Sequence, residues 1–136
     1  MTDETAMREL AHRFFDAIEQ GDVDGIRAAY APDAQIWYNT DRRDKGVDEN
    51  VARLVKAKGM LKDRLYKERR VQVFPGGFVH QHVLHGIRAD GEPCTMPACC
   101  VCFVENGRIT RLEEYMDSAD QQRLWAAVAA SPAGEG

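Results

Sequence analysis

Apolar residues recur with helical spacing in the first part of this 136-residue chain and again near its end. The first helical pattern includes Leu10, Phe14 and Ile18, which are four positions apart, and it stops at Gly21. Each later pattern follows a side chain that can cap a helix. The expected helices are residues 3–20 after Thr2 or Asp3, Val23–Tyr30 after Asp22, Glu49–Lys58 after Asp48, and Ala119–Ala130 after Ser118.

Between the helical patterns, residues that favour strands dominate the sequence. Ala34–Thr40 and Leu65–Phe74 each predict one strand. Three more strands are expected between Phe78 and Asp117, separated by Asp90-Gly91 and Asn106-Gly107. Both dipeptides are typical of two-residue hairpin turns, in which both central residues take a positive φ. The three runs therefore predict an antiparallel meander.

The order of these elements indicates an α+β fold. Helices come early and strands cluster late, so we expect a curved antiparallel sheet with the N-terminal helices packed on one face. Such a sheet resembles a cone, or a cystatin-like α+β barrel, and its apolar interior is a natural small-molecule pocket. The length fits one domain over residues 1–130, followed by a flexible tail over residues 131–136.

Composition and charge narrow the class of protein further. A net charge of −4 gives no reason to expect nucleic-acid or membrane binding, and no apolar run is long enough to span a bilayer. The acidic N-terminal stretch lacks the plan of a signal peptide, so we expect a cytoplasmic protein. The four cysteines crowd onto one predicted strand, where Cys99 and Cys102 point to opposite faces. Buried reduced thiols are therefore expected, not a disulfide framework.

Two predicted strands carry side chains suited to proton transfer. Glu114 alternates with Leu112 and Met116, which places one carboxylate on an apolar strand face, where burial would raise its pKa towards neutrality. His80 and His82 share one face of another strand, and imidazole can exchange a proton near pH 7. The apolar residues of that strand do not decide which face lies inside. A metal site with Glu114 as third ligand is an alternative use of the two histidines.

The two ends of the chain resemble the nuclear transport factor 2-like superfamily. The segments RFFDAIEQGDVDGIRAAYAPDAQI and FVENGRITRLEEYMD carry this resemblance, which covers nearly the whole chain. Within the superfamily, the chain is similar to the SnoaL-like polyketide cyclase, ketosteroid isomerase and limonene epoxide hydrolase branches. This fold hosts enzymes, binding domains and assembly modules, so the resemblance alone does not define an activity.

The catalytic residues of two branches are only partly matched. Phe14, Tyr38 and Cys99 stand at or next to the positions of the ketosteroid isomerase Tyr and two Asp residues. Of the Asp-Arg-Asp set of limonene epoxide hydrolases, Glu114 matches one Asp, and His82 or Gln81 stands in place of the Arg. Both of those mechanisms are weakened by these differences.

The resemblance implies a site that works without metal or cofactor. It favours His82 as the pocket histidine, and it places Tyr38 where relatives carry a catalytic or orienting group. We therefore predict an enzyme in which Glu114 and His82 share the acid and base roles and Tyr38 donates a hydrogen bond. The expected substrate-binding wall consists of Phe14, Phe15, Ile36, His80, Leu84, Cys99, Leu112, Met116 and Trp125.

The predicted chemistry is an isomerase, cyclase, dehydratase or related lyase reaction on a hydrophobic cyclic or aromatic molecule. A non-catalytic ligand-binding or assembly domain is the alternative, and epoxide hydrolysis is a further one. Many relatives pair through the open sheet face, so the resemblance also implies a homodimer. Arg42 and Arg43 lie in a polar loop near the expected pocket mouth. A solvated loop is the simpler interpretation, and contact with an anionic substrate group is the alternative.

Overall fold

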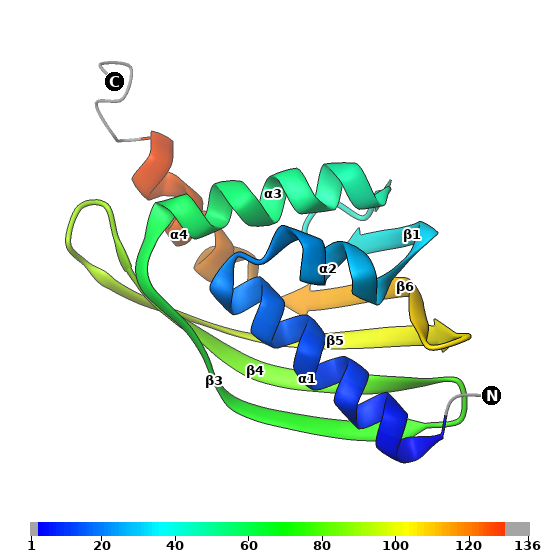
Figure 1. The fold of residues 1–136 in the computed structure, drawn as a ribbon. Helices are drawn as coiled ribbons and strands as arrows, with labels where there is room; N and C mark the ends of the chain where they lie inside the picture. The colour runs from blue at the N-terminus through cyan, green and yellow to red at the C-terminus, as the bar shows by residue number, and fades with distance from the viewer. Residues whose placement is uncertain (1–2, 130–136) are drawn as a thin grey trace.

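The computed structural model describes residues 3–129, with side-chain environments for residues 3–125. These residues form four helices and a six-stranded sheet, and the first helix lies across the sheet (Figure 1). The predicted tail over residues 131–136 lies outside the described residues. The elements are α1 (Glu4–Gln20), α2 (Val23–Ala29), β1 (Tyr30–Tyr38), β2 (Asp44–Lys45), α3 (Val47–Met60), β3 (Leu61–Phe74), β4 (Gly77–Arg88), β5 (Pro93–Glu105), β6 (Arg108–Met116) and α4 (Ser118–Ala129).

Helix α1 supplies much of the core because its apolar stripe faces the sheet. Asp3 caps its first turn by accepting a hydrogen bond from the Ala6 amide at 2.8 Å. Gly21 ends it with φ of 73°, a left-handed conformation that glycine adopts without a Cβ penalty. Phe14 and Phe15 are almost fully buried beneath it. The predicted boundaries of this helix are confirmed.

The sheet has the order β2-β1-β6-β5-β4-β3 and remains open at both edges. The predicted α+β class and the curved sheet covered by helices on one face are confirmed. The expectation of a wholly antiparallel sheet is wrong at one pair, because β1 runs parallel to β6. This pairing joins the first strand to the last one, and hairpin signals between neighbouring strands do not report such a connection. Tyr38 is thereby placed directly opposite Glu114.

The meander β4-β5-β6 is present, and its two turns differ. At the second turn, Asn106 and Gly107 have φ of 52° and 75°, as the predicted hairpin requires. At the first turn only Gly91 has a positive φ, of 86°. The side chain of Asp90 accepts from the Glu92 amide at 3.1 Å, which supports a longer loop than the predicted two-residue turn.

Irregularities in the pairing of β3 and β6 influence which of their side chains face the helices. On β3, the register shifts between Lys62 and Leu65 and again between Lys67 and Arg70. On β6, a shift lies between Ile109 and Arg111, opposite Phe103 and Val104 of β5. An extra residue in one strand reverses which face the following side chains occupy. Ile109 and Leu112 are therefore both buried, although one residue number is odd and the other even. Glu114 and Met116, which alternate with Leu112 along the strand, also face inwards.

Some predicted boundaries needed correction. The polar loop before α3 contains the two-residue strand β2, which pairs with β1. Helix α3 begins after Gly46, earlier than the predicted cap Asp48. At α4 the capping side chain is Asp117, whose carboxylate accepts from the amides of Ala119 and Asp120 at 2.7 and 3.2 Å. Ser118 is instead the first residue of that helix.

No helix within residues 3–129 is long and apolar enough to span a membrane.

Candidate active site

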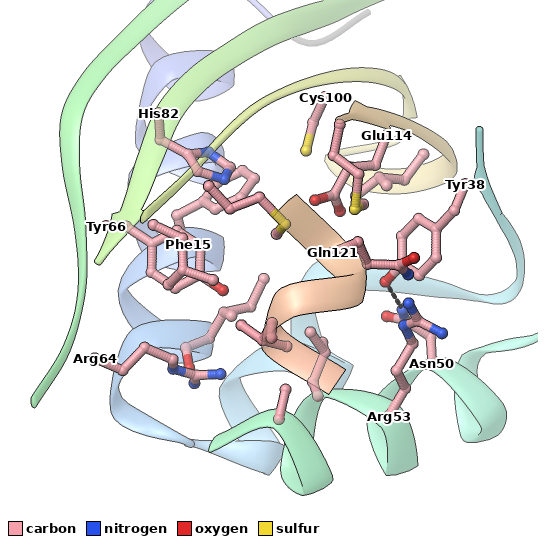
Figure 2. Close-up of a pocket in the computed structure, with 18 of the residues that line it drawn as sticks. Phe15, Tyr38, Asn50, Arg53, Arg64, Tyr66, His82, Cys100, Glu114 and Gln121 are labelled. Atoms are coloured by element: carbon pink, nitrogen blue, oxygen red, sulfur yellow. Dashed lines mark hydrogen bonds between the residues drawn. The ribbon is translucent and has the colours of Figure 1, made fainter. Parts of the chain in front are cut away.

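A largely apolar cavity lies between the sheet and helices α1, α3 and α4. Its volume is about 70 Å³. That is smaller than the roughly 150 Å³ that holds benzene in an engineered protein cavity, so a ring-sized ligand requires side chains to move. Met96, Met116 and Leu124 line the cavity, and flexible methionines allow such movement. Figure 2 shows polar side chains entering this cavity from several elements.

Glu114 supplies the carboxylate of the cavity. It lies on β6 in the inward-facing set created by the bulge after Ile109. Burial raises the pKa of this carboxyl from 4.5 to about 7, although the positive charge of Arg53 and a hydrogen bond with the Cys100 thiol act in the opposite direction. A carboxyl group with this pKa can both accept and return a proton near neutrality. Glu113, the next residue, forms a 2.8 Å ion pair with Arg111 instead.

His82 and His80 form a buried pair on β4. Their Nδ1 atoms are 3.0 Å apart, and the His80 ring stacks on Phe15 with a centroid distance of 3.6 Å. Burial lowers the pKa of His82 to about 4 and that of His80 to about 3, so both rings are neutral at pH 7. His82 lines the cavity, whereas His80 lies behind Phe15. The even-numbered face of the strand is therefore the inner face.

The Nδ1 contact restricts which ring nitrogen of each histidine can carry the proton. One Nδ1 must donate and the other accept, because both rings are neutral. Nε2 of His80 is buried and has no partner within the described part of the chain, and an unpaired acceptor is tolerated there more readily than an unpaired N–H. His80 therefore carries its proton on Nδ1 and donates it to Nδ1 of His82. The proton of His82 then lies on Nε2, where His82 can act as a hydrogen-bond donor.

Tyr38 ends a chain of buried hydrogen bonds. The Tyr30 hydroxyl donates to Oδ1 of Asn50 at 2.8 Å, and Nδ2 of Asn50 donates to the Tyr38 oxygen at 2.8 Å. Burial and the nearby Glu114 raise the pKa of Tyr38 well above its ordinary value, so the phenol keeps its proton. Since its oxygen already accepts from Asn50, the Tyr38 O–H is the group left to donate to a ligand.

The structure brings most of the predicted site residues together. Tyr38, His82 and Glu114 all line the same cavity. Of the predicted wall, the residues that also line it are Phe14, Phe15, Leu84, Leu112, Met116 and Trp125.

Three predicted wall residues lie elsewhere. Ile36 is fully buried in the core, and His80 packs behind Phe15. Cys99 faces the other side of the sheet, because Cys100, its neighbour on β5, is the residue that points inwards. Arg43, one of the loop arginines considered for an anionic group, pairs with Glu49 on the surface.

Several residues that line the cavity were not predicted from the sequence. Asn50, Arg53, Leu54 and Ala57 of α3 all line the cavity, and their spacing of i, i+3, i+4 and i+7 could have revealed this face. Gln121 enters from α4. No sequence signal marks Arg64, because a bulge in β3 sets its direction.

The cysteines form no disulfide, and two of them are buried in the core. All four cysteines are free, and burial raises the pKa of Cys100 and Cys102 well above that of an exposed thiol. Among the residues whose side chains the structure describes, no group of three or more His, Cys, Asp or Glu could hold a metal ion. His80 and His82 instead contact each other directly.

The family of the chain follows from its sequence as well as its fold. The SnoaL-like domain profile matches residues 11–112, so the chain belongs to the SnoaL-like domain family. A search of curated proteins finds no significant match.

Solved structures share the fold at low sequence identity. A candidate polyketide cyclase from Xanthomonas campestris pv. campestris is 19% identical, with a TM-score of 0.76, covering 86% of this chain and 94% of its own. An epoxide hydrolase from M. tuberculosis, similar to limonene epoxide hydrolase, is 22% identical, with a TM-score of 0.71 and 92% coverage of both chains. PrhC from Penicillium brasilianum is 15% identical, with a TM-score of 0.79, covering 93% of this chain and 89% of its own.

Proposed function

We propose that this protein is an enzyme that moves a proton on a small cyclic or aromatic substrate bearing a carbonyl or hydroxyl group. The reaction is an isomerisation, an aldol-type cyclisation, a dehydration or a related lyase step, and it requires no cofactor. The observation that carries the proposal is Glu114, a carboxyl group with a pKa of about 7 in an apolar cavity. A group that titrates near the working pH is the most effective general base.

The roles of the neighbouring groups follow from their hydrogen bonds. Glu114 removes a proton from carbon next to the substrate carbonyl. The Tyr38 O–H, whose oxygen already accepts from Asn50, donates to the oxygen that becomes negative. His82, neutral and protonated on Nε2, is the second donor and stabilises the same charge. Glu114 then returns its proton at a second position of the substrate.

Epoxide hydrolysis is the second candidate, and one observation favours it. Sequence reasoning found no arginine for such a mechanism, whereas Arg53 of α3 lines the cavity and acts electrostatically on Glu114. The epoxide hydrolase from M. tuberculosis shares the fold. However, Glu114 is the sole carboxylate among the described residues that line this cavity. Proton transfer needs one carboxylate, so it fits the cavity better.

Turnover of a substrate panel tests the proposal. The panel contains cyclic ketones, polyketide-like aromatics and epoxides, each incubated with the wild type, Glu114→Gln and the control Glu113→Gln. We expect turnover in the first two classes, lost with Glu114→Gln and kept with Glu113→Gln. Binding without turnover would support a ligand-binding domain, and turnover of epoxides alone would support the second candidate.

A further inference from the structure

Within the described residues, two arginines of the cavity form no ion pair with a carboxylate. Arg64 is buried, with 5% of its surface exposed, and Arg53 is half-buried; both line the cavity. In Figure 2 the Arg64 guanidinium lies at the lower left of the view, away from Glu114, whereas Arg53 points towards Tyr38. The described part of the chain contains four other arginines that are not fully exposed, and all of them pair with acidic side chains: Arg8, Arg69, Arg88 and Arg111.

The direction of Arg64 is set by the first bulge of β3. Lys62 pairs with Ile87 and Leu65 with His85, so Asp63 and Arg64 together oppose a single residue of β4. Asp63 takes a φ of 53°, in the left-handed region. The bulge turns the Arg64 side chain from the exposed edge strand towards the interior.

Only some of the N–H donors of the Arg64 guanidinium have hydrogen-bond partners within the described residues. One Nη donates to the carbonyl of Ile18, in the last turn of α1, where the helix dipole favours a positive charge. Nε is buried and has no hydrogen-bond partner among the residues that the structure describes. A buried cation with no anionic partner is costly, because the charge has lost its hydration. An anion bound in the cavity would supply the missing partner.

Arg53 adds a second positive charge to the cavity, and its guanidinium contacts aromatic rings. Its guanidinium lies 4.6 Å from the centre of the Tyr38 ring and 5.2 Å from that of Trp125. Contacts with ring faces leave the N–H groups at the edge of the guanidinium plane free to donate. The rest of the wall is mostly apolar, with Phe15, Leu84 and Leu124 among its members.

We propose that the cavity binds a small apolar carboxylate and that Arg64 holds its carboxyl group. This inference rests on the proposed function, since it names the substrate class of the same site. A planar carboxylate matches the fork of N–H donors on a guanidinium, which makes it the preferred anion. The apolar body of the ligand then lies against the aromatic and methionine wall, and its reacting atoms lie towards Glu114.

Benzoate and benzamide test the proposal because they have nearly the same shape and differ in charge. Binding of each is measured by calorimetry to the wild type, Arg64→Gln, Arg64→Lys and Arg13→Gln, where Arg13 is an exposed arginine on α1. We expect the wild type to bind benzoate at least about tenfold more tightly than benzamide, the effect of one good charged hydrogen bond. Arg64→Gln should remove this preference, Arg64→Lys should keep part of it, and Arg13→Gln should leave it unchanged.

Each outcome separates ligand binding from a purely structural role. If Arg64 only completes the last turn of α1, Arg64→Gln will lower stability and leave the preference for benzoate intact, which overturns the proposal. Equal binding of the two ligands to the wild type, or no benzoate binding up to about 10 mM, also overturns it and needs no variant to fold. Glu114→Gln should abolish turnover while keeping the preference for benzoate. If the binding test fails, the proposal that Arg64 binds a carboxylate is wrong, and the proposal that Glu114 transfers a proton on a neutral substrate is unaffected.

Discussion

Replacing Glu114 by glutamine is expected to make the protein more stable at pH 8 while removing its activity. The pKa of Glu114 is raised by burial from 4.5 to about 7. Between these values the folded state holds a proton that the unfolded state has lost, so the contribution of Glu114 to stability falls as the pH rises through this window. Glutamine has nearly the same shape and does not ionise, so the variant escapes this loss.

The size of the effect follows from the difference between the two pKa values. At about 1.4 kcal/mol per pH unit, the shift from 4.5 to about 7 corresponds to at most about 3.5 kcal/mol. Water that enters the cavity would hydrate the carboxylate and reduce this figure. The stability difference between Glu114→Gln and the wild type should therefore grow by about 2–3 kcal/mol between pH 4.5 and pH 8.

Urea unfolding at both pH values measures this difference, because titration of all other groups cancels between variant and wild type. Glu113→Gln is the matched control, since Glu113 lies on the opposite face in an ion pair with Arg111. Loss of this half-exposed pair should cost less than about 1 kcal/mol and should not favour the variant at pH 8. A Glu114→Gln advantage that is the same at both pH values would refute the raised pKa of Glu114.

Further predictions concern the donors, the pH dependence and the assembly. Tyr38→Phe should lower kcat about 10²-fold or more, as loss of an oxyanion donor does, whereas Tyr115→Phe on the outer face should leave it unchanged; unaltered kcat in Tyr38→Phe would remove that role. In long-range ¹H–¹⁵N spectra, His82 should be protonated on Nε2 and His80 on Nδ1, both neutral down to about pH 5; protonation of His82 on Nδ1 would contradict this. If Glu114 is the base, kcat/KM should rise with pH to a plateau with an apparent pKa near 7, and a profile flat from pH 5 to 8 would exclude it. We also propose a homodimer through the outer sheet face, where Phe103 and Tyr115 are 37% and 43% exposed; light scattering should give twice the monomer mass, reduced by Tyr115→Glu, and a monomer at every concentration would contradict it.

Strand alternation in the sequence was sufficient to place Glu114. Its neighbours Leu112 and Met116 defined an apolar face, and that face lines the cavity. Alternation could not place Arg64, because an unpaired extra residue in β3 reverses the faces and leaves no mark in the pattern of polar and apolar residues. The parity of the histidine strand was equally ambiguous, since Val79 and Val83 on the outer face are half-buried and as apolar as the inner residues.

The pairing of strands that lie far apart in the chain was the second feature that could not be predicted from the sequence. Hairpin dipeptides predict that neighbouring strands pair, and they correctly gave the meander. The parallel contact between β1 and β6, which sets Tyr38 opposite Glu114, joins segments far apart in the chain. Asn50 was missed for a different reason. It lies on the inner face of α3, but a helix that carries charged residues on several sides reads most simply as a solvated surface helix.

Exchange of carbon-bound hydrogen for deuterium tests the central claim most directly. Cyclic ketones, with and without a carboxylate substituent, are incubated in D₂O, and loss of the proton signals next to the carbonyl is followed by NMR. The wild type should accelerate this loss at least about 10²-fold over Glu114→Gln, the usual contribution of a positioned base. Equal exchange rates with the two proteins, for every ketone that binds, would show that Glu114 is not the base.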